Sequence, residues 1–176
     1  EVCFRIGNNG WTFDQVAAAK LYAELAHRRA ELTGELNELF PPWDVEEEFI
    51  PKVNIKTRGY VKGEVFIKRK VITFNPGSRQ HIQKCLVEKY GWKPKEFTNN
   101  GQAKIDDEIL GTLDYPEAKR LAELFLINKR IAMLAEGSHA WLKKVDADGR
   151  IRHTINSGGT VSGRASHSSP NLAQVP

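Results

Sequence analysis

A short run near the end of the chain, residues 162–176, carries the side chains best suited to chemistry. It holds one arginine, Arg164, and two carboxamides, Asn171 and Gln174, among small hydroxylated residues and prolines. These groups donate hydrogen bonds, and the DNA minor groove offers purine N3 and pyrimidine O2 as acceptors, almost independently of sequence. The run therefore fits a protein that holds base-paired DNA without reading it. The alternative is structural: Arg164 pairs with a carboxylate, Asn171 caps a turn after Pro170, and Gln174 faces water.

Other residue types that catalyse reactions or bind metals do not form recognisable sites. The carboxylate clusters at 46–48 and 106–108 could hold Mg²⁺ with water and phosphate, but acidic runs are more often solvated. Asp106 and Asp107 also suit the start of a short helical turn. The histidines lack zinc spacing, and neither a nucleophile elbow nor a Walker loop is present. We expect no catalytic residue and no metal site in this sequence.

The composition indicates a globular chain with a mild preference for polyanions. Its 176 residues can bury a core, and 26 basic against 22 acidic residues give a net charge of +4. Cys3 and Cys85 are far apart and do not form a disulfide framework, which favours a reducing, intracellular setting. No apolar run approaches the roughly 20 residues that span a bilayer. Residues 1–6 lack the features of a signal peptide and predict a strand.

The apolar periodicity predicts a long helix first. Thr12 and Gln15 have the spacing of a capping box, and the apolar residues behind them recur at threes, fours and sevens. They form one stripe: Val16, Leu21, Leu25, Leu32, Leu36 and Leu39. Residues 44–74 are rich in Val, Ile and Tyr and predict short strands and loops. Their basic residues form either a solvated surface or a phosphate-contacting tip.

Two further helices follow. Asn75 predicts an N-cap, with Pro76 at the first helical position and Gly91 at the end. Another capping box, at 114–117, predicts a third helix that runs to about Gly137. Its apolar residues cover more than half of its circumference, which predicts burial: Leu121, Leu124, Phe125, Ile127, Ile131 and Leu134.

The remaining sequence predicts strands. Residues 140–145 and 150–155 are β-prone and are joined through Asp148–Gly149, which predicts a hairpin. Residues 156–159 predict a further turn. Helices first and strands later indicate an α+β fold, with a helical lobe up to about residue 139 and then the edge of a sheet-bearing lobe.

The end of the chain resembles a motif of family A DNA polymerases, the proteins similar to bacterial DNA polymerase I. Residues 162–176 are similar to the family pattern Thr-Gly-Arg-x-Ser-Ser-x-x-Pro-Asn-Leu-Gln-Asn-Ile-Pro, and His167 with Ala173-Gln174 resembles the phage branch. Upstream, residues 74–79 resemble the start of a thumb helix, and 124–132 resemble the long helix that leaves the thumb. The resemblance covers most of residues 72–176 and is weaker at 10–40.

The resemblance implies a fragment of a larger right-hand polymerase fold. Residues 1–139 would form a mainly helical thumb-like region, with 44–71 as a basic insertion at the thumb tip. Residues 140–176 would form the start of the palm, with antiparallel strands at its edge and the primer–template contact motif. Because the sequence stops in mid-motif, we expect it to be part of a longer protein.

The resemblance also implies a set of DNA-contacting residues: Arg164, Asn171, Gln174, Lys129, Ser78 and Arg79. Arg164 is expected near the primer terminus, Asn171 at the adjacent sugar or base edge, and Gln174 where most relatives have Asn. Ala173 departs from the usual Gln, so one contact is missing or is supplied by Gln174. Lys129 matches a lysine that faces the primer strand. Ser78 and Arg79 lie at a helix start, where backbone N–H groups suit a phosphate.

Catalysis is expected of the parent and not of this fragment. In the family, Mg²⁺ is held by aspartates that lie beyond the position of Pro176, and two-metal phosphoryl transfer to dNTPs needs both. Residues 44–71 lie where some phage enzymes carry a longer loop that captures a host processivity protein. The expected location is the cytoplasm of a bacterial host cell.

Two rival hypotheses stay open at this point. The chain could be a stand-alone, sequence-independent nucleic-acid-binding module without a polymerase parent. It could also be a helical protein-interaction domain that uses the stripe from Leu21 to Leu39.

Overall fold

The computed structural model describes residues 1–173 and 175, and it divides into two compact units. Unit 1 joins Glu1–Thr33 with Asp106–Pro176, and unit 2 is Gly34–Ile105. Helix α2 (Gln15–Leu39) contributes its first part to unit 1 and its last turns to unit 2. Helices and two-stranded antiparallel sheets make up the described elements, which confirms the α+β class.

The core of unit 1 is built on the third predicted helix. Helix α5 (Pro116–Ile131) packs against α4 (Asp107–Thr112) and continues into the π-helical turn η2 (Ala132–Glu136). The predicted burial is confirmed for five of its apolar residues: Leu121, Leu124, Ile127, Ile131 and Leu134. The predicted cap at Asp114 is wrong. Tyr115 is the N-cap, Pro116 occupies the first helical position, and the Asp114 carboxylate pairs with Lys119 Nζ at 2.8 Å.

Two arginine–glutamate pairs tie α2 to α5 and η2 within unit 1. Arg28 donates from Nε and Nη2 to both carboxylate oxygens of Glu123, at 2.8 and 3.1 Å. Arg29 makes the equivalent pair with Glu136, at 2.8 and 2.9 Å, and the Tyr22 hydroxyl also donates to Glu136. These pairs are partly exposed, so each stabilises the fold by no more than about 1 kcal/mol. Their fork-on-fork geometry fixes the rotation of α2 about its axis.

The predicted strand at the start of the chain is wrong, because residues Val2–Asn9 form helix α1. A Cβ on Gly7 would come within 2.5 Å of the His153 carbonyl oxygen, so the glycine allows the helix to approach the neighbouring backbone. Arg150 Nη1 donates to Asn9 O at 2.9 Å, and Arg152 Nε donates to Asn8 O at 2.8 Å. Distant arginines thus satisfy the last carbonyls of the helix. These tertiary contacts outweigh the β propensity of residues 1–6.

The long helix begins two residues later than the predicted cap allows. Thr12 lies in strand β1 (Trp11–Thr12), and the Asp14 carboxylate accepts the Ala17 N–H at 2.9 Å in its place. The predicted stripe is buried only in its second half, where Leu32 and Leu36 are fully buried. Val16 is 82% exposed.

The predicted strand at 140–145 is also wrong. Trp141–Lys143 form a 3-10 turn, η3, because Lys143 Nζ reaches back to the carbonyls of Glu136 and Gly137 at 2.9 and 3.1 Å. The Asp148–Gly149 turn is present, with Gly149 at φ 74°. It leads into β4 (Arg150–Ile151), which pairs mainly with β1.

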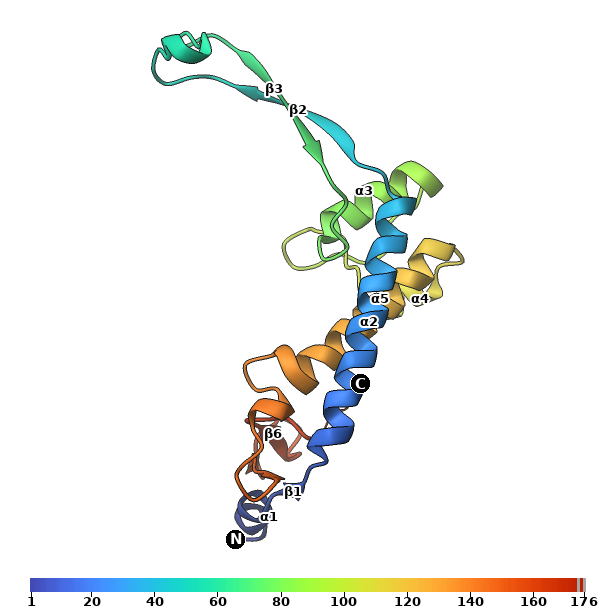
Figure 1. Ribbon diagram of the computed structural model, residues 1–176, viewed down its shortest axis with the longest axis vertical. Helices are drawn as coiled ribbons and strands as arrows, with labels where there is room; N and C mark the ends of the chain where they lie inside the picture. Colours follow the sequence, from blue (N-terminus) through green and yellow to red (C-terminus); the bar gives the residue numbers. More distant parts are fainter. Residues whose placement is uncertain (174, 176) are drawn as a thin grey trace. The chain divides into compact units, whose positions relative to one another are not determined.

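Unit 2 contains a long hairpin and a helix. Strands β2 (Trp43–Phe49) and β3 (Phe66–Ile72) pair along their full length, and a loop with the 3-10 turn η1 (Lys56–Arg58) joins them (Figure 1). This confirms the predicted strands and loops. Buried apolar residues form the base of the unit: Leu36, Phe40, Phe74, Ile82, Leu86 and Ile105.

Helix α3 (Arg79–Tyr90) starts later than predicted. Ser78 is the N-cap, and its Oγ accepts the His81 N–H at 3.4 Å. Asn75 instead closes a turn, with Oδ1 accepting the Gly77 N–H at 2.8 Å. Gly91 ends the helix in the left-handed conformation, as predicted. The division of the chain at residue 139 into thumb and palm stays a prediction, because compact units defined by contact need not match subdomains defined by role.

Candidate nucleic-acid interface

Arg164 lies on the loop of a small hairpin in unit 1. Strand β5 (Thr154–Asn156) pairs antiparallel with β6 (Ser166–Ser168), with Asn156 opposite Ser166 at the mouth of the loop. A Cβ on Gly159 would lie 1.8 Å from Ser166 Oγ, so only glycine fits there. The ladder therefore anchors both ends of the loop that presents Arg164.

The Arg164 side chain is exposed, and its guanidinium has no hydrogen bond or ion pair among the residues that the structure describes. The alternative in which it pairs with a carboxylate is not what the structure shows. From Gly149 to Pro176 the sequence contains no Asp or Glu. The five donors of this guanidinium are consequently open to an external acceptor.

Asn171 lies close after the hairpin and has one side of its amide fixed. Its Oδ1 accepts the Ala173 N–H at 3.0 Å, so the oxygen is held against the backbone. Because the Ala173 N–H needs an acceptor, Oδ1 and not Nδ2 of Asn171 must face the backbone. The Nδ2 group is left to donate, and the two predicted roles of Asn171, turn cap and external donor, are compatible in one rotamer.

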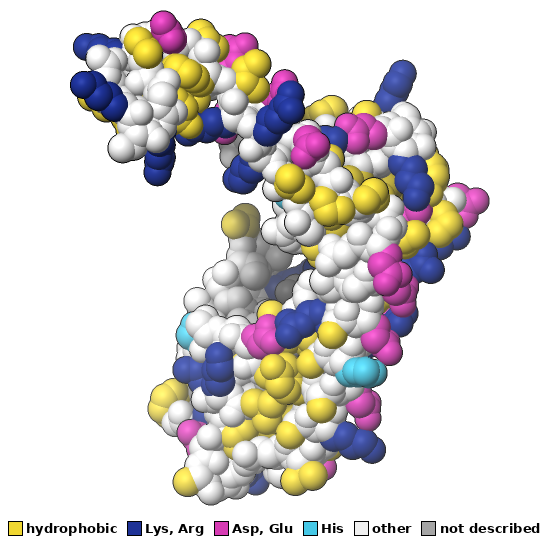
Figure 2. All heavy atoms as spheres, turned by 45° about the horizontal axis from the view of Figure 1, so that its top comes forward, with side chains coloured by type: hydrophobic (Ala, Val, Ile, Leu, Met, Phe, Trp, Pro, Cys, Tyr) yellow, Lys and Arg dark blue, Asp and Glu magenta, His cyan; other side chains and the backbone are white. Residues whose placement is uncertain are grey.

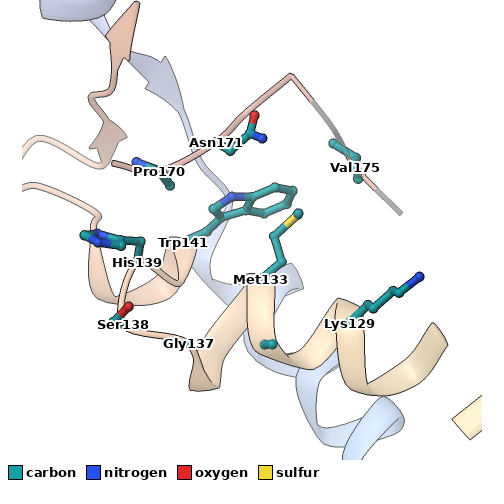
Figure 3. Close-up of a pocket in the computed structure, with 10 residues that line it drawn as sticks. Lys129, Met133, Gly137, Ser138, His139, Trp141, Pro170, Asn171 and Val175 are labelled. Atoms are coloured by element: carbon teal, nitrogen blue, oxygen red, sulfur yellow. The ribbon is translucent and has the colours of Figure 1, made fainter. Parts of the chain in front are cut away.

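A cavity of about 590 Å³ opens beside Asn171 (Figure 3). Trp141 lies between the Pro170–Asn171 segment and Met133 of η2, and Lys129 and His139 also line the cavity. The Trp141 ring packs edge-on against Phe13, with centroids 6.2 Å apart. The cavity is thus an apolar floor with a few polar groups around it, and it brings Asn171 and Lys129 to one place.

Lys129 is not free. Its Nζ lies 2.5 Å from Asp107 Oδ1, at the first residue of α4. The hydrogen bond from this ammonium holds the pKa of Asp107 below its usual range. The lysine remains 56% exposed, so it is accessible to a second anion.

Ser78 and Arg79 belong to unit 2, whereas Arg164 belongs to unit 1. The Ser78 hydroxyl is used as the helix cap, and Arg79 Nε donates to the Ile105 carbonyl at 3.0 Å. Gln174 lies outside the described residues. Of the six predicted residues, Asn171 and Lys129 line one cavity and Arg164 lies on the β5–β6 loop of the same unit. Ser78 and Arg79 are neighbours at the start of α3 in unit 2.

Sequence reasoning missed a stacked histidine pair at the hairpin. The rings of His153 and His167 stack at 5.0 Å and 14°, and His153 is almost fully buried. Neither ring nitrogen of His153 has a hydrogen-bond partner among the described residues. Burial, and secondarily His167, lowers the pKa of His153. The available signal in the sequence was the position of His153, two residues after the apolar Ile151 in a β-prone run, which would place both side chains on one face of the predicted strand.

The described residues were found to contain neither a metal-binding cluster nor a membrane-spanning helix. In the part of the chain that the structure describes, no three His, Cys, Asp or Glu side chains gather as a metal site. Across the same residues, no helix is both long and apolar enough to cross a bilayer.

Comparison with known proteins shows what the chain resembles. Residues 56–176 match the model of DNA polymerase family A. The chain is 38% identical to the DNA-directed DNA polymerase of Enterobacteria phage T3 and 37% identical to that of Escherichia phage T7. Both alignments cover 96% of this chain and span 30% of the relative's length. At 213 positions they are longer than the chain itself, so both relatives carry residues that it lacks.

A solved structure agrees on the fold. The POL domain of Pol1 from M. smegmatis, in complex with DNA primer-template and dNTP, matches with a TM-score of 0.65 at 18% identity. The match covers 96% of this chain and 24% of that chain. The sequence match extends over two thirds of the residues and includes the hairpin with Arg164, so this chain belongs to DNA polymerase family A.

Proposed function

We propose that the full-length protein is a DNA-directed DNA polymerase and that this chain holds its primer–template duplex. The observation that carries the proposal is the Arg164 guanidinium, exposed and without a partner among the described residues, on a loop that lacks any acid. Family membership supports the polymerase over a stand-alone binding module. It likewise supports it over an interaction domain built on α2, where Leu32 and Leu36 already belong to the core.

The minor groove explains the choice of donors. A polymerase must hold every sequence equally, and purine N3 and pyrimidine O2 are present at every base pair. Arg164 and the Nδ2 group of Asn171 offer donors, and residues 149–176 contain no carboxylate side chain that would repel the duplex. Gln174, by its place in the motif, is proposed as a third donor.

The remaining predicted residues are proposed to contact phosphate. Lys129 would exchange Asp107 for a phosphate of the primer strand. Ser78 and Arg79 would act from the start of α3, where the exposed end of the helix favours an anion. Phosphate contacts position the protein on the duplex without reading sequence.

The chemistry of nucleotide addition is assigned to residues outside this chain. Magnesium in such enzymes is held by carboxylates, and the described residues provide no cluster that fits it. As the resemblance to family A polymerases implies, the dNTP and Mg²⁺ are proposed to bind in the rest of the full-length protein, inside a bacterial host cell. This chain contributes orientation of the primer end.

The Arg164→Ala variant of the full-length protein tests the proposal. We expect affinity for a recessed primer–template to fall roughly 10- to 100-fold, because a charge-assisted hydrogen bond contributes about 1.5–3 kcal/mol. Fluorescence anisotropy and primer extension measure this. Arg5→Ala, another exposed arginine of unit 1, is the matched control. Equal affinity for the two variants would refute the proposal.

The tip of the β2–β3 hairpin is proposed as a second DNA contact. Lys52, Lys56, Arg58 and Lys62 are exposed and show no ion pair among the described residues, and Figure 2 shows Lys and Arg side chains clustered at this end. The same segment also carries exposed apolar residues: Ile50, Val53, Val61 and Val65. The competing occupant is a host processivity protein.

The two occupants differ in a purified system. If the tip binds phosphate, replacing Lys52, Lys56 and Lys62 with alanine lowers the slope of log affinity against log salt by about 0.9 for each phosphate that is no longer neutralised. Alanine at Lys20, Lys93 and Lys95, three exposed lysines outside the hairpin, should change the slope less. A variant that binds DNA normally and loses only a host protein's stimulation of processivity would point to the protein partner instead.

A further inference from the structure

We infer that Thr160 is a positioning residue that holds Arg164 ready for DNA. The inference rests on the proposed function of Arg164. It concerns a residue that lies four positions earlier in the β5–β6 loop and that does not itself reach toward the duplex. Its role would be to fix the backbone from which the guanidinium extends.

The Thr160 hydroxyl contacts both backbone groups of Arg164. Its Oγ1 accepts the Arg164 N–H at 2.9 Å and donates to the Arg164 carbonyl at 3.0 Å. Ser162 Oγ lies 3.2 Å from Thr160 Oγ1. A hydroxyl has one proton and two acceptor sites. Since the Thr160 proton goes to the carbonyl, Ser162 must be the donor in that third contact, and Thr160 Oγ1 is fully satisfied.

Further backbone contacts close the loop around this hydroxyl. The Gly163 N–H donates to the Thr160 carbonyl at 3.0 Å, and Gly163 has a φ of 74°, which glycine adopts without strain. At the base of the loop, Asn156 accepts the Gly159 N–H on its carbonyl at 3.3 Å and the Gly158 N–H on its side chain at 3.2 Å. The backbone is therefore held by hydrogen bonds on both sides of Thr160, at Gly158–Gly159 before it and at Gly163 after it.

The result is a fixed backbone that carries a free side chain. Both polar backbone groups of Arg164 are used by one hydroxyl, while its guanidinium has no partner among the described residues. Holding a contact residue in its bound backbone conformation raises affinity, because less ordering remains to be done on binding. An unanchored loop would have to order when DNA arrives.

Threonine suits this role better than valine or serine, the amino acids of similar size. Its branched β-carbon restricts χ1, so the hydroxyl is held in place. Valine has the same shape but neither donor nor acceptor. Serine keeps the hydroxyl with a freer χ1. These differences provide matched substitutions.

The test uses the full-length protein with Thr160→Val, Thr160→Ser, Arg164→Ala and the double variant Thr160→Val/Arg164→Ala. We expect Thr160→Val to weaken primer–template binding roughly three- to tenfold, as for the loss of one or two neutral hydrogen bonds, and Thr160→Ser to restore most of it. KM for primer–template should rise while kcat is kept. In the Arg164→Ala background, Thr160→Val should have no further effect. Thr112→Val, which removes another exposed threonine bond to backbone, at 2.7 Å, is the control.

Hydrogen exchange gives a readout that does not depend on DNA. Without DNA, the Arg164 amide should exchange faster in Thr160→Val than in the wild type. Equal exchange, or additive losses in the double variant, would overturn the positioning role of Thr160 even if Arg164 binds DNA. Faster exchange in Thr160→Val together with unchanged DNA binding by Arg164→Ala would instead refute the proposed function, and with it the inference.

Discussion

At the scale of single residues, the interface is defined by the hydrogen bonds that each residue already makes to its own backbone. The oxygen of the Asn171 amide is occupied by the Ala173 N–H, and the backbone of Arg164 is occupied by Thr160. In both cases the groups that remain are donors. A surface of donors alone is selective for acceptor-rich partners, which is the chemical character of a minor groove.

Lys129 shows the opposite arrangement, because an acid of the same chain already occupies its ammonium. Asp107 Oδ1 lies 2.5 Å from Lys129 Nζ, at a distance where a phosphate oxygen could bind instead. An exposed pair of this kind contributes about 0.2–1 kcal/mol. If Lys129 contacts the primer strand as proposed, a phosphate would compete with Asp107 for its ammonium, and this competition would slightly weaken binding.

Removing the acid should relieve that competition. We expect Asp107→Asn to increase affinity for primer–template by roughly two- to fivefold at low salt, since Lys129 is released for phosphate. Asp114→Asn is the matched control, because it releases Lys119 of the same helix from a pair of similar length. Equilibrium binding titrations of both variants measure the effect. If Asp107→Asn gains no more than Asp114→Asn, Lys129 does not contact DNA.

At the scale of secondary structure, local rules predicted the elements whose stability is local. The burial of α5, the β2–β3 hairpin and the glycine end of α3 follow from periodicity, β-prone composition and a left-handed glycine. Helix α1 and the turn at Trp141–Lys143 do not. Distant arginines bond the last carbonyls of α1, and Lys143 of the turn bonds the carbonyls of Glu136 and Gly137. Helices α3 and α5 begin later than predicted for a related reason. Several residues near each start could serve as the N-cap, and the turn before the helix determines which one does.

The same distinction applies to the interface. Arg164 and Asn171 could be chosen from residue type and motif, since donors are visible in the sequence. The partners Thr160 and Asp107 could not, because nothing in the spacing shows which hydroxyl or acid will close on which neighbour. The burial of His153 likewise depends on α1 packing against β5.

The β5–β6 hairpin should be sensitive to acid through His153. Burial lowers its pKa in the folded chain below the ordinary value near 6.5, so the unfolded chain binds the proton first as pH falls. The free energy of unfolding should therefore be unaffected above about pH 7, and should decrease as pH falls through 6.5 toward the lower folded pKa. His153→Phe should flatten this dependence.

Urea midpoints of the full-length protein between about pH 5 and 8 measure that dependence. His27→Gln, on an exposed position of α2, is the control and should keep the wild-type profile. A His153→Phe profile that falls as steeply as the wild type would mean that another group causes the acid sensitivity.

At the scale of the whole molecule, fold and sequence have diverged at different rates. The match to the M. smegmatis POL domain keeps a TM-score of 0.65 at 18% identity, whereas the phage relatives keep 37–38% identity over the same share of the chain. Apolar positions tolerate exchange so long as volume and pattern are kept. The fold is thus kept at a sequence identity well below that of the phage relatives.

The discontinuity of unit 1 has a consequence for how the chain is made. Its first part, Glu1–Thr33, leaves the ribosome before unit 2, and its core partners in α5 come only after Ile105. On the order of 70 residues separate the two parts, which is several seconds of translation at roughly 5–20 residues per second. During that interval Leu32, which is fully buried in the folded chain, belongs to a unit that is still incomplete. We expect the nascent chain to offer this apolar position to chaperones and the folded protein to conceal it.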